Sequence, residues 1–376
     1  MTIIPFNKPY LGGKELRNIS QAHARGQFSG VGIFTEQCQE WLEDRIGCRR
    51  AMLTHSCTAA LEMAAILVDI QPGDEVIMPS YTFVSTANAF VLRGGVPVFV
   101  DIREDTLNID EARIENAITE KTKAIVPVHY AGVGCEMDAI MEIAGRHNLM
   151  VIEDAAQGAM STYEGRPLGS IGHIGCLSFH ETKNITSGEG GALLINDASL
   201  VERAEIIRQN GTNRNEFFRG KVNKYMWVDI GSSYLPGEIT AAFLWAQIEE
   251  VDNITNRRLA IWNRYHSAFE SLENAGRVQR PYVPNHCLHN AHMYYLMLPY
   301  PGQRALFIDS LKSKGIHSVF HYVPLHDSLM GRRCGITPHE LKVTDEISER
   351  LVRLPLWLGI EEYQPEVIRQ VRSLLS

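Results

Sequence analysis

Short apolar runs alternate with amphipathic stretches from residue 51 onward, and this alternation limits the folds that the chain can adopt. The apolar runs have the length of buried strands and cover residues 51–54, 75–78, 96–100, 124–128 and 149–153. Between them, apolar side chains recur at helical spacing in residues 58–68, 84–92, 109–118 and 137–147. A β-α-β-α order predicts an α/β fold with a mostly parallel sheet flanked by helices.

Two later segments predict how this sheet continues and where a second domain begins. Residues 175–179 and 191–195 are apolar and enclose a polar, glycine-containing loop, so we expect a strand, a loop at a strand end, and a second strand. The pattern is then helical through residues 238–272, followed by a smaller α+β pattern in residues 291–298, 304–314 and 318–323. We expect a large domain with an N-terminal arm (1–240), then a bridging helix and small domain (241–376).

Composition excludes several classes of protein. With 36 Lys and Arg against 44 Asp and Glu, the net charge of -8 gives no sign of a nucleic-acid-binding surface. The seven cysteines form no CxxC pair, which favours reduced thiols. The N-terminus lacks the pattern of a signal peptide, and no apolar run reaches membrane-spanning length. We therefore expect a cytoplasmic protein without nucleic-acid or membrane partners.

Hydroxyl-bearing residues follow the first strand, where a helix is expected to begin. Free backbone N–H groups at this helix start, with the hydroxyls of Ser56 and Thr58 on either side of Cys57, could bind a phosphate. A serine or threonine at this position is also an ordinary helix N-cap, and the segment alone favours that simpler role.

Asp154 and Gln157 follow a predicted strand, near the edge of the sheet where ligands bind in α/β proteins. A carboxylate there can keep a pyridine nitrogen protonated and so make the ring an electron sink. Gln157 could hydrogen-bond a hydroxyl of the same ring. An Asp154 that merely caps a following helix explains the carboxylate equally well.

Lys183 lies between a buried strand and the glycine-rich stretch 188–191. An amine that forms an imine must lose a proton, and partial burial beside cationic groups lowers its pKa for that step. A solvated loop lysine is the common alternative. Phe83, near the start of another predicted helix, could stack on a planar cofactor or belong to the core beneath the sheet.

Together, these segments resemble the sugar aminotransferases of the DegT/DnrJ/EryC1 family, which are fold-type I pyridoxal-phosphate enzymes. The resemblance spans essentially the whole chain, and its motifs S-F-H-x-x-K-N…G-E-G-G, E-D-A-A-Q and P-S-x-T-F-V-S-T are jointly specific. It implies that Lys183 binds the cofactor covalently, that Asp154 pairs with the pyridine nitrogen, and that Gln157 lies beside the ring oxygen. It further implies a ring stacked under Phe83 and a phosphate bound by Ser56, Cys57, Thr58 and Ser178.

The resemblance also implies an activity. Pyridoxal 5'-phosphate, with pyridoxamine phosphate as its aminated form, would carry an amino group from L-glutamate to a nucleotide-linked keto-sugar. Lys183 would move the proton as general acid and base. Within the family, residues 211–220, 224–227, 229–235 and 319–326 are most similar to members that act on a dTDP-linked 4-keto-6-deoxy sugar.

Substrate contacts are expected from two further segments. The first is a basic loop that could bind the nucleotide diphosphate or form a solvated charged surface, with Arg214, Arg219, Lys221 and Lys224. The second is expected to line the sugar-nucleotide pocket, with His321, Tyr322 and His326. No metal site is expected, because these histidines have no further ligands nearby in the sequence.

Family members use the basic loop across a subunit boundary, so a homodimer with shared sites is expected. Many members also carry an Asn and an Arg that reach the neighbouring subunit's phosphate in a G-x-N-x-R segment. This chain has Ser233 and Leu235 there, which leaves Ser233 as the candidate phosphate contact.

Two other functions fit the sequence less well. A nicotinamide-dependent oxidoreductase would share the alternating order, but no G-x-G-x-x-G follows a first strand. A cofactor-binding regulator without turnover is disfavoured because Lys183, Asp154 and Gln157 occur together. Relatives that dehydrate sugars replace the lysine with histidine, and Lys183 argues against that branch.

Overall fold

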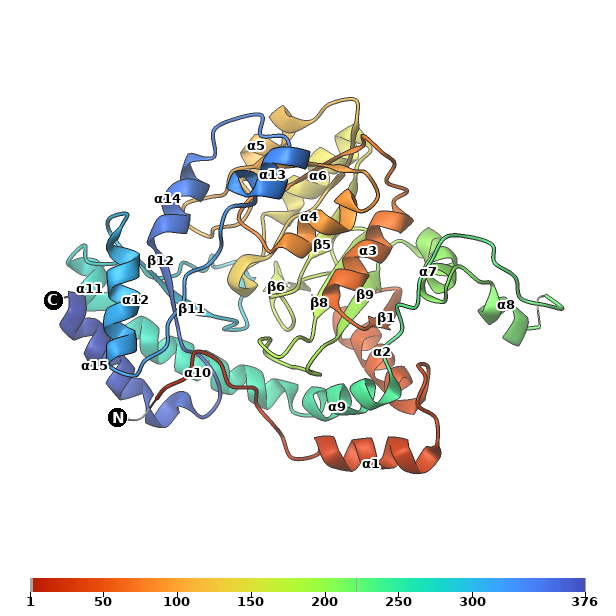
Figure 1. The fold of residues 1–376 in the computed structure, drawn as a ribbon, viewed down its shortest axis with the longest axis horizontal. Coiled ribbons are helices and arrows are strands. Elements are labelled where there is room, and N and C mark those ends of the chain that lie inside the picture. The colour runs from red at the N-terminus through yellow and green to blue at the C-terminus, as the bar shows by residue number, and fades with distance from the viewer. Residues whose placement is uncertain (1–2, 221, 376) are drawn as a thin grey trace.

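A computed structural model describes residues 3–220 and 222–375 and contains a central seven-stranded sheet in the order β1-β9-β8-β5-β4-β2-β3 (Figure 1). The strands are β1 (Arg50–Thr54), β2 (Glu75–Pro79), β3 (Val96–Val100), β4 (Thr122–Ile125), β5 (Met150–Asp154), β8 (Ile174–Ser178) and β9 (Gly191–Ile195). β9 is antiparallel to both of its neighbours, whereas the pairs from β8 to β3 are parallel. The predicted mostly parallel α/β sheet is confirmed.

Alternating side chains of each strand enter two cores, one on each face of the sheet. In β1, Ala51 and Leu53 belong to one buried cluster and Met52 to the other, as the two-residue period of a strand requires. The first core includes side chains of α2 (Ile33–Ile46), α6 (Met137–His147) and α9 (Glu238–Ile248). The second includes those of α3 (Cys57–Leu67), α4 (Val84–Val91) and α7 (Val201–Arg208). The helices therefore cover both faces.

The strand-loop-strand prediction for residues 175–195 is confirmed. β8 and β9 pair in antiparallel register, with Ser178 opposite Gly191, so the intervening loop begins and ends at the same edge of the sheet. The helix predicted over residues 109–118 is shorter than expected. It consists of α5 (Glu111–Ile114) and the 3-10 turn η1 (Glu115–Ala117), after which Ile118 is extended.

The long helix predicted from residue 238 is divided. α9 ends at Ile248, α10 (Val251–Ala268) begins after a break at Glu250, and α11 (Glu270–Asn274) follows. Beyond them, β11 (Tyr294–Met297) and β12 (Leu351–Leu354) form a separate antiparallel pair. The helices of this part are α12 (Gln303–Ser313), α13 (Leu329–Cys334), α14 (Lys342–Arg350) and α15 (Gln364–Leu375). Residues 318–323 contribute only a bridge between Val319 and Arg353. A domain boundary at residue 240 stays a prediction.

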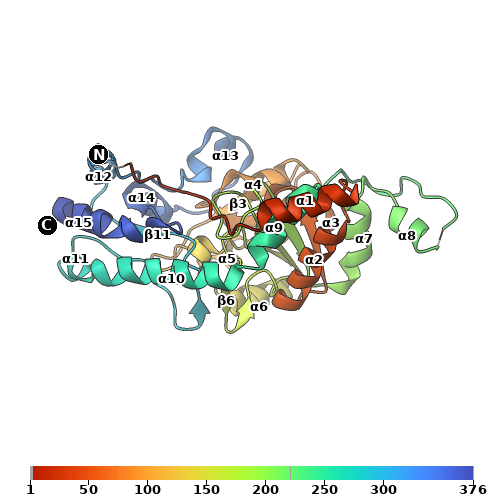
Figure 2. The same cartoon turned by 90° about the horizontal axis from the view of Figure 1, so that it is seen from below.

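The N-terminal arm connects the two ends of the molecule. Ile4 forms a parallel bridge with Ile316, and the chain then runs along the body to α1 (Glu15–Arg25), which packs on α9 (Figure 2). On the opposite side, α8 (Arg214–Phe218) projects away from the sheet (Figure 1). A small sheet is formed by β6 (Thr162–Tyr163), β7 (Arg166–Pro167) and β10 (Cys287–Leu288). Among the described residues, no helix is long and apolar enough to span a membrane.

Candidate active site

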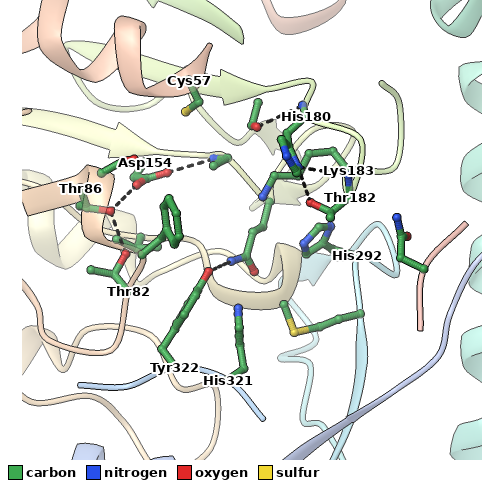
Figure 3. A pocket seen from close by; sticks show the side chains of 18 of the residues that line it. Cys57, Thr82, Thr86, Asp154, His180, Thr182, Lys183, His292, His321 and Tyr322 are labelled. Atoms are coloured by element: carbon green, nitrogen blue, oxygen red, sulfur yellow. Dashed lines mark hydrogen bonds between the residues drawn. The ribbon is translucent and has the colours of Figure 1, made fainter. Parts of the chain in front are cut away.

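A cavity of about 580 Å³ opens where β5 and β8 reach their carboxyl ends. Its walls come from parts of the chain that are distant in sequence: the N-terminal arm, the starts of α3 and α4, the segment that ends β5, the loop between β8 and β9, and the C-terminal region. Side chains from these parts converge on one space (Figure 3). Its position at the carboxyl edge of the sheet is where open α/β folds place their ligands.

The N-terminus of α3 forms one end of this cavity. Ser56 caps the helix, because its hydroxyl accepts a hydrogen bond from the Ala59 N–H at 3.1 Å, and its side chain also lines the cavity. The hydroxyl of Thr58 lies 2.8 Å from that of Ser85. A Cβ at Gly191 would lie 2.4 Å from the Cys57 nitrogen, so only glycine lets β9 approach the helix so closely. The helix start thus presents unpaired N–H groups and hydroxyls suited to an anion.

Asp154 is the last residue of β5 and is buried. One carboxylate oxygen accepts a hydrogen bond from the Thr86 hydroxyl at 2.7 Å, and the other accepts one from the Ala156 N–H at 3.1 Å. Thr82 lies 2.8 Å from Thr86 and must be the donor in that contact, since the single hydroxyl proton of Thr86 is used on Asp154. No helix follows Asp154 directly, so helix capping does not explain this carboxylate.

Lys183 lies in the β8–β9 loop, where its backbone N–H donates to the His180 carbonyl at 2.9 Å. The side chain is half-buried and lines the same cavity as Asp154 (Figure 3). Burial lowers the pKa of the Lys183 amine; the Cys57 thiol and the Asp154 carboxylate act against this, and the charge of Arg353 adds to it. A lysine in this environment is not the solvated loop residue of the alternative interpretation, and its amine is more easily deprotonated.

Aromatic and amide side chains form another wall of the cavity. Gln157 is fixed at both ends: its carbonyl accepts from the Ala131 N–H at 2.7 Å, and its amide donates to the Tyr322 hydroxyl at 3.0 Å. The Phe83 ring is 57% exposed and its centroid lies 6.5 Å from that of Tyr322, so Phe83 is not a core residue. His321 also lines the cavity, with Nδ1 2.9 Å from the Tyr130 hydroxyl.

Several expected site residues lie away from this cavity in the single chain. Arg214 and Arg219 belong to the projecting α8 region, where Arg219 pairs with Glu205 at 3.0 Å. His326 contacts the Ser80 hydroxyl at 2.7 Å instead of the cavity. The backbone of Ser233 forms an isolated antiparallel β-bridge with that of Gln209. Lys224 is exposed and does not line the cavity, and Lys221 lies outside the described residues.

The cavity also contains residues that the sequence did not predict. Thr86 lies three positions after Phe83, in the P-S-x-T-F-V-S-T motif already used for Phe83, so this motif could have predicted it. Arg258, His292 and Arg353 come from α10, the following loop and β12, and no local motif marks them. Burial lowers the pKa of His292 and of His321 well below the ordinary histidine value, so both rings are neutral near Lys183. Among the described residues, no three His, Cys, Asp or Glu side chains are grouped as metal ligands.

Comparison with known proteins identifies the family. The sequence pattern of the DegT/DnrJ/EryC1/StrS aminotransferase family matches residues 9–372. The chain belongs to this family. It is 33% identical to the spore coat polysaccharide biosynthesis protein SpsC of Bacillus subtilis, over 99% of this chain and 97% of that one. It is 34% identical to GDP-perosamine synthase of Caulobacter vibrioides, over 94% of this chain and 93% of the other.

Solved structures agree with the sequence relatives. The Spr1654 protein of Streptococcus pneumoniae in its PMP form superimposes with a TM-score of 0.92 at 25% identity, covering 99% of this chain and 98% of that chain. Its PLP form gives a TM-score of 0.90. The protein is therefore a pyridoxal-phosphate-dependent sugar aminotransferase of fold type I. The cavity fits this cofactor, because it combines an anion-binding helix start, a buried carboxylate and a lysine with a lowered pKa.

Proposed function

We propose that the protein transfers the amino group of L-glutamate to the keto carbon of dTDP-4-dehydro-6-deoxy-D-glucose, in the cytoplasm. The products are dTDP-4-amino-4,6-dideoxy-D-galactose and 2-oxoglutarate. The observation that carries the chemistry is that Lys183 and Asp154 line one cavity together with the N-terminus of α3. The choice of sugar rests on the similarity of residues 211–235 and 319–326 to dTDP-4-amino-4,6-dideoxygalactose transaminase of enterobacterial common antigen synthesis.

Asp154 and its partners would hold the ring nitrogen of the cofactor. When bound, pyridoxal phosphate supplies an electron sink for the bond that breaks at the substrate carbon. Asp154 would accept a hydrogen bond from the protonated ring nitrogen and keep that proton in place. The Thr86 hydroxyl and the Ala156 N–H orient the carboxylate for this contact.

Lys183 would hold the cofactor covalently and then move the proton. Burial lowers the pKa of the Lys183 amine and so favours its neutral form, which would accept a proton from the substrate carbon and return it on the cofactor side. The same group serves both half-reactions, first with the amino acid and then with the sugar.

The remaining walls would bind the other ends of the cofactor. Ser56, Cys57 and Thr58 at the start of α3, with Ser178 at the end of β8, would contact the phosphate through hydroxyl and N–H groups. Phe83 would cover the ring. The second amide proton of Gln157 is available for the ring oxygen, since the first is used on Tyr322.

A homodimer would complete the site. The segment that follows α8 exposes large apolar side chains, with Tyr225 at 54%, Met226 at 63% and Trp227 at 79%. Contiguous exposed apolar surface of this kind is typical of an interface. A neighbouring subunit would cover it, and the segment would bring Arg214, Arg219, Lys221, Lys224 and Ser233 toward the neighbour's nucleotide and phosphate.

A GDP-linked 4-keto sugar is the second candidate substrate, because the chain is 34% identical to a protein named GDP-perosamine synthase. A panel of dTDP-, UDP- and GDP-linked 4-keto and 3-keto sugars, each with L-glutamate, separates the candidates. We expect the dTDP-linked 4-keto sugar to be converted fastest. The proton couplings at C4 of its product, measured by NMR, should show that the new amine is axial. Faster turnover of another nucleotide or of a 3-keto sugar would contradict the assignment.

A further inference from the structure

His292 lies near Lys183 in the cavity, and its neighbours determine which of its two ring nitrogens carries the proton (Figure 3). The residue belongs to the segment between β10 and β11. We propose that Nε2 of His292 accepts a hydrogen bond from the Lys183 ammonium group when that group is free of the cofactor, and so positions it for proton transfer. The inference rests on the proposed function, because it takes Lys183 as the group that moves the proton.

Asn184 fixes the tautomer of His292. The Asn184 amide nitrogen donates to the Asn290 carbonyl at 2.7 Å, because a reversed amide would bring two oxygens that close together. The Asn184 amide oxygen, which can only accept, lies 3.2 Å from Nδ1 of His292, so Nδ1 must be the donor in that contact. Burial lowers the pKa of His292 well below the ordinary histidine value, and the neutral ring carries a single proton. That proton is on Nδ1, and Nε2 therefore keeps an unshared electron pair.

The backbone on either side of the ring is also held in place. The His292 N–H donates to the Asn290 side-chain oxygen at 2.9 Å, and the Asn290 amide donates to the Gln157 carbonyl at 2.8 Å. Arg258 of α10 donates to the carbonyl of Ala291 at 3.1 Å and to that of His292 at 2.8 Å. A ring fixed at its backbone and at Nδ1 keeps Nε2 in a constant direction relative to the β8–β9 loop.

The amine of Lys183 is the donor that fits this nitrogen. Asn184 follows Lys183 directly in the chain, so the contact that fixes the imidazole also fixes the backbone next to the lysine. The charge of Lys183 contributes to the lowered pKa of His292, which places the two side chains within interaction range. Arg258 and Arg353 are the other cations that lower this pKa, but an arginine stays charged throughout a reaction. Only the lysine needs an acceptor at one step and none at the next.

A neutral acceptor suits an amine that must gain and then lose one proton. The Lys183 amine becomes an ammonium group when it takes the proton from the substrate carbon, and one of its N–H bonds then points to Nε2. The proton returns on the cofactor side, so no proton passes to the imidazole. A hydrogen bond to the charged form raises the pKa of an amine, and a carboxylate here would do so strongly enough to oppose the effect of burial. The uncharged imidazole orients the ammonium group with a smaller effect.

Two substitutions separate the roles of the two ring nitrogens. In His292→Asn the amide nitrogen is as many bonds from Cα as Nδ1, so the contact with Asn184 is kept, but nothing replaces Nε2. In His292→Gln the amide oxygen is as many bonds from Cα as Nε2, so an acceptor is restored. His289→Asn is the matched control, because His289 belongs to the same segment but packs on Trp262 outside the cavity, with 4.4 Å between the ring centroids.

Stopped-flow absorbance follows each half-reaction of the holoenzyme separately. In His292→Asn the maximal rates of both should fall by about 10- to 100-fold, as for the loss of a hydrogen bond to a charged group, while the glutamate concentration for half-maximal rate stays unchanged. Glutamate deuterated at its α-carbon should show a larger isotope effect than in the wild type, because proton transfer becomes slower. His292→Gln should recover part of the rate, and His289→Asn should stay near the wild type.

Other outcomes overturn the proposal. A loss confined to the sugar half-reaction would place Nε2 at a sugar hydroxyl, and a higher glutamate requirement without a slower step would place it at the donor. A wild type that converts no dTDP-linked keto-sugar contradicts the proposed function instead, and the glutamate half-reaction then still tests His292.

Two measurements do not depend on turnover. NMR of the wild type labelled with ¹⁵N-histidine should show a neutral ring with its proton on Nδ1, at signals that either variant lacks; a proton on Nε2 or a charged ring overturns the proposal. The second is the pH dependence of Lys183 acetylation in protein saturated with pyridoxamine phosphate, read by mass spectrometry. The pKa of Lys183 should be lower in His292→Asn by about one unit or more, because the ammonium group loses an acceptor, and His292→Gln should restore it. An unchanged or raised pKa in His292→Asn overturns the proposal.

Discussion

Thr86 donates its hydroxyl proton to the Asp154 carboxylate over 2.7 Å, from the first turns of α4 to the end of β5. Thr82 in turn donates to Thr86 at 2.8 Å, so a short chain of hydroxyls fixes one oxygen of the carboxylate. Both threonines are buried, which strengthens each link and makes its loss more damaging.

Replacing Thr86 by valine should weaken binding of pyridoxamine phosphate by about tenfold or more, since a hydrogen bond to a charged group contributes roughly 1.5–3 kcal/mol. The shape of the side chain is retained, so the loss reports the hydrogen bond. Fluorescence titration of the purified protein with pyridoxamine phosphate measures it. Thr82→Val, which removes only the outer link, should have a smaller effect. An unchanged affinity in Thr86→Val would mean that the hydroxyl does not support Asp154.

Lys183→Ala should still bind the cofactor but lose transamination. The start of α3 and Asp154 provide noncovalent binding, whereas only the lysine provides the covalent link and the proton transfer. The visible absorbance of the lysine-bound cofactor should vanish, and turnover should fall by about ten-thousand-fold or more, at or beyond the upper end for a lost general base. If multiple-turnover activity stayed within about tenfold of the wild type, the role of Lys183 would have to be abandoned.

The pH dependence of cofactor attachment should reflect the lowered pKa of Lys183. Only the neutral amine reacts with the aldehyde, so the rate falls as the pH drops below that pKa and levels off above it. Because the pKa is shifted downward, the midpoint should lie below the ordinary lysine value of 10.5. Stopped-flow absorbance after mixing apoprotein with pyridoxal phosphate measures the profile. A midpoint at or above that value would show that burial does not assist deprotonation.

Shared sites in a homodimer should be visible by complementation. A Lys183→Ala chain should be inactive alone, and an Arg214→Ala/Arg219→Ala chain should be only weakly active alone. If the projecting segment serves the neighbouring subunit, a mixed dimer regains one intact site of its two. When equal amounts of the two chains exchange at random, about half of the dimers are mixed, so up to about a quarter of the wild-type activity should return. Light scattering of the wild type should give a dimer. Mixtures that stay as inactive as their components, or a fully active monomer, would disprove sharing.

Much of the large domain could be predicted, because its strands are apolar runs bounded by polar turns. The segments around Ser56, Asp154 and Lys183 each follow a strand that ends at one edge of the sheet, and the resemblance to the family predicted that they serve one cofactor. The break at Glu250 left no signal, since neither glycine nor proline marks it and both helices keep an apolar face. Local sequence cannot reveal such a change of helix direction.

Contacts that depend on chain packing were also beyond prediction. His326 occurs in the same short segment as His321, yet it turns to Ser80 while His321 faces the cavity. Arg353 lines the cavity from β12, which pairs with β11, and the N-terminal arm places Phe6 over its guanidinium group. Neither pairing is encoded by spacing within a single segment, and both require the folded C-terminal part.

The loop that carries Lys183 is attached to the sheet at both ends, where Ser178 pairs with Gly191. The register on either side is fixed by the backbone pairing of β8 with β9, in which the Lys183 side chain takes no part. A substitution at position 183 alters the chemistry available in the cavity and leaves the hydrogen bonds of β8 and β9 in place. Such a scaffold is open to evolutionary change: descendants can acquire a new reaction by exchanging one loop side chain, without first having to find a new way to fold.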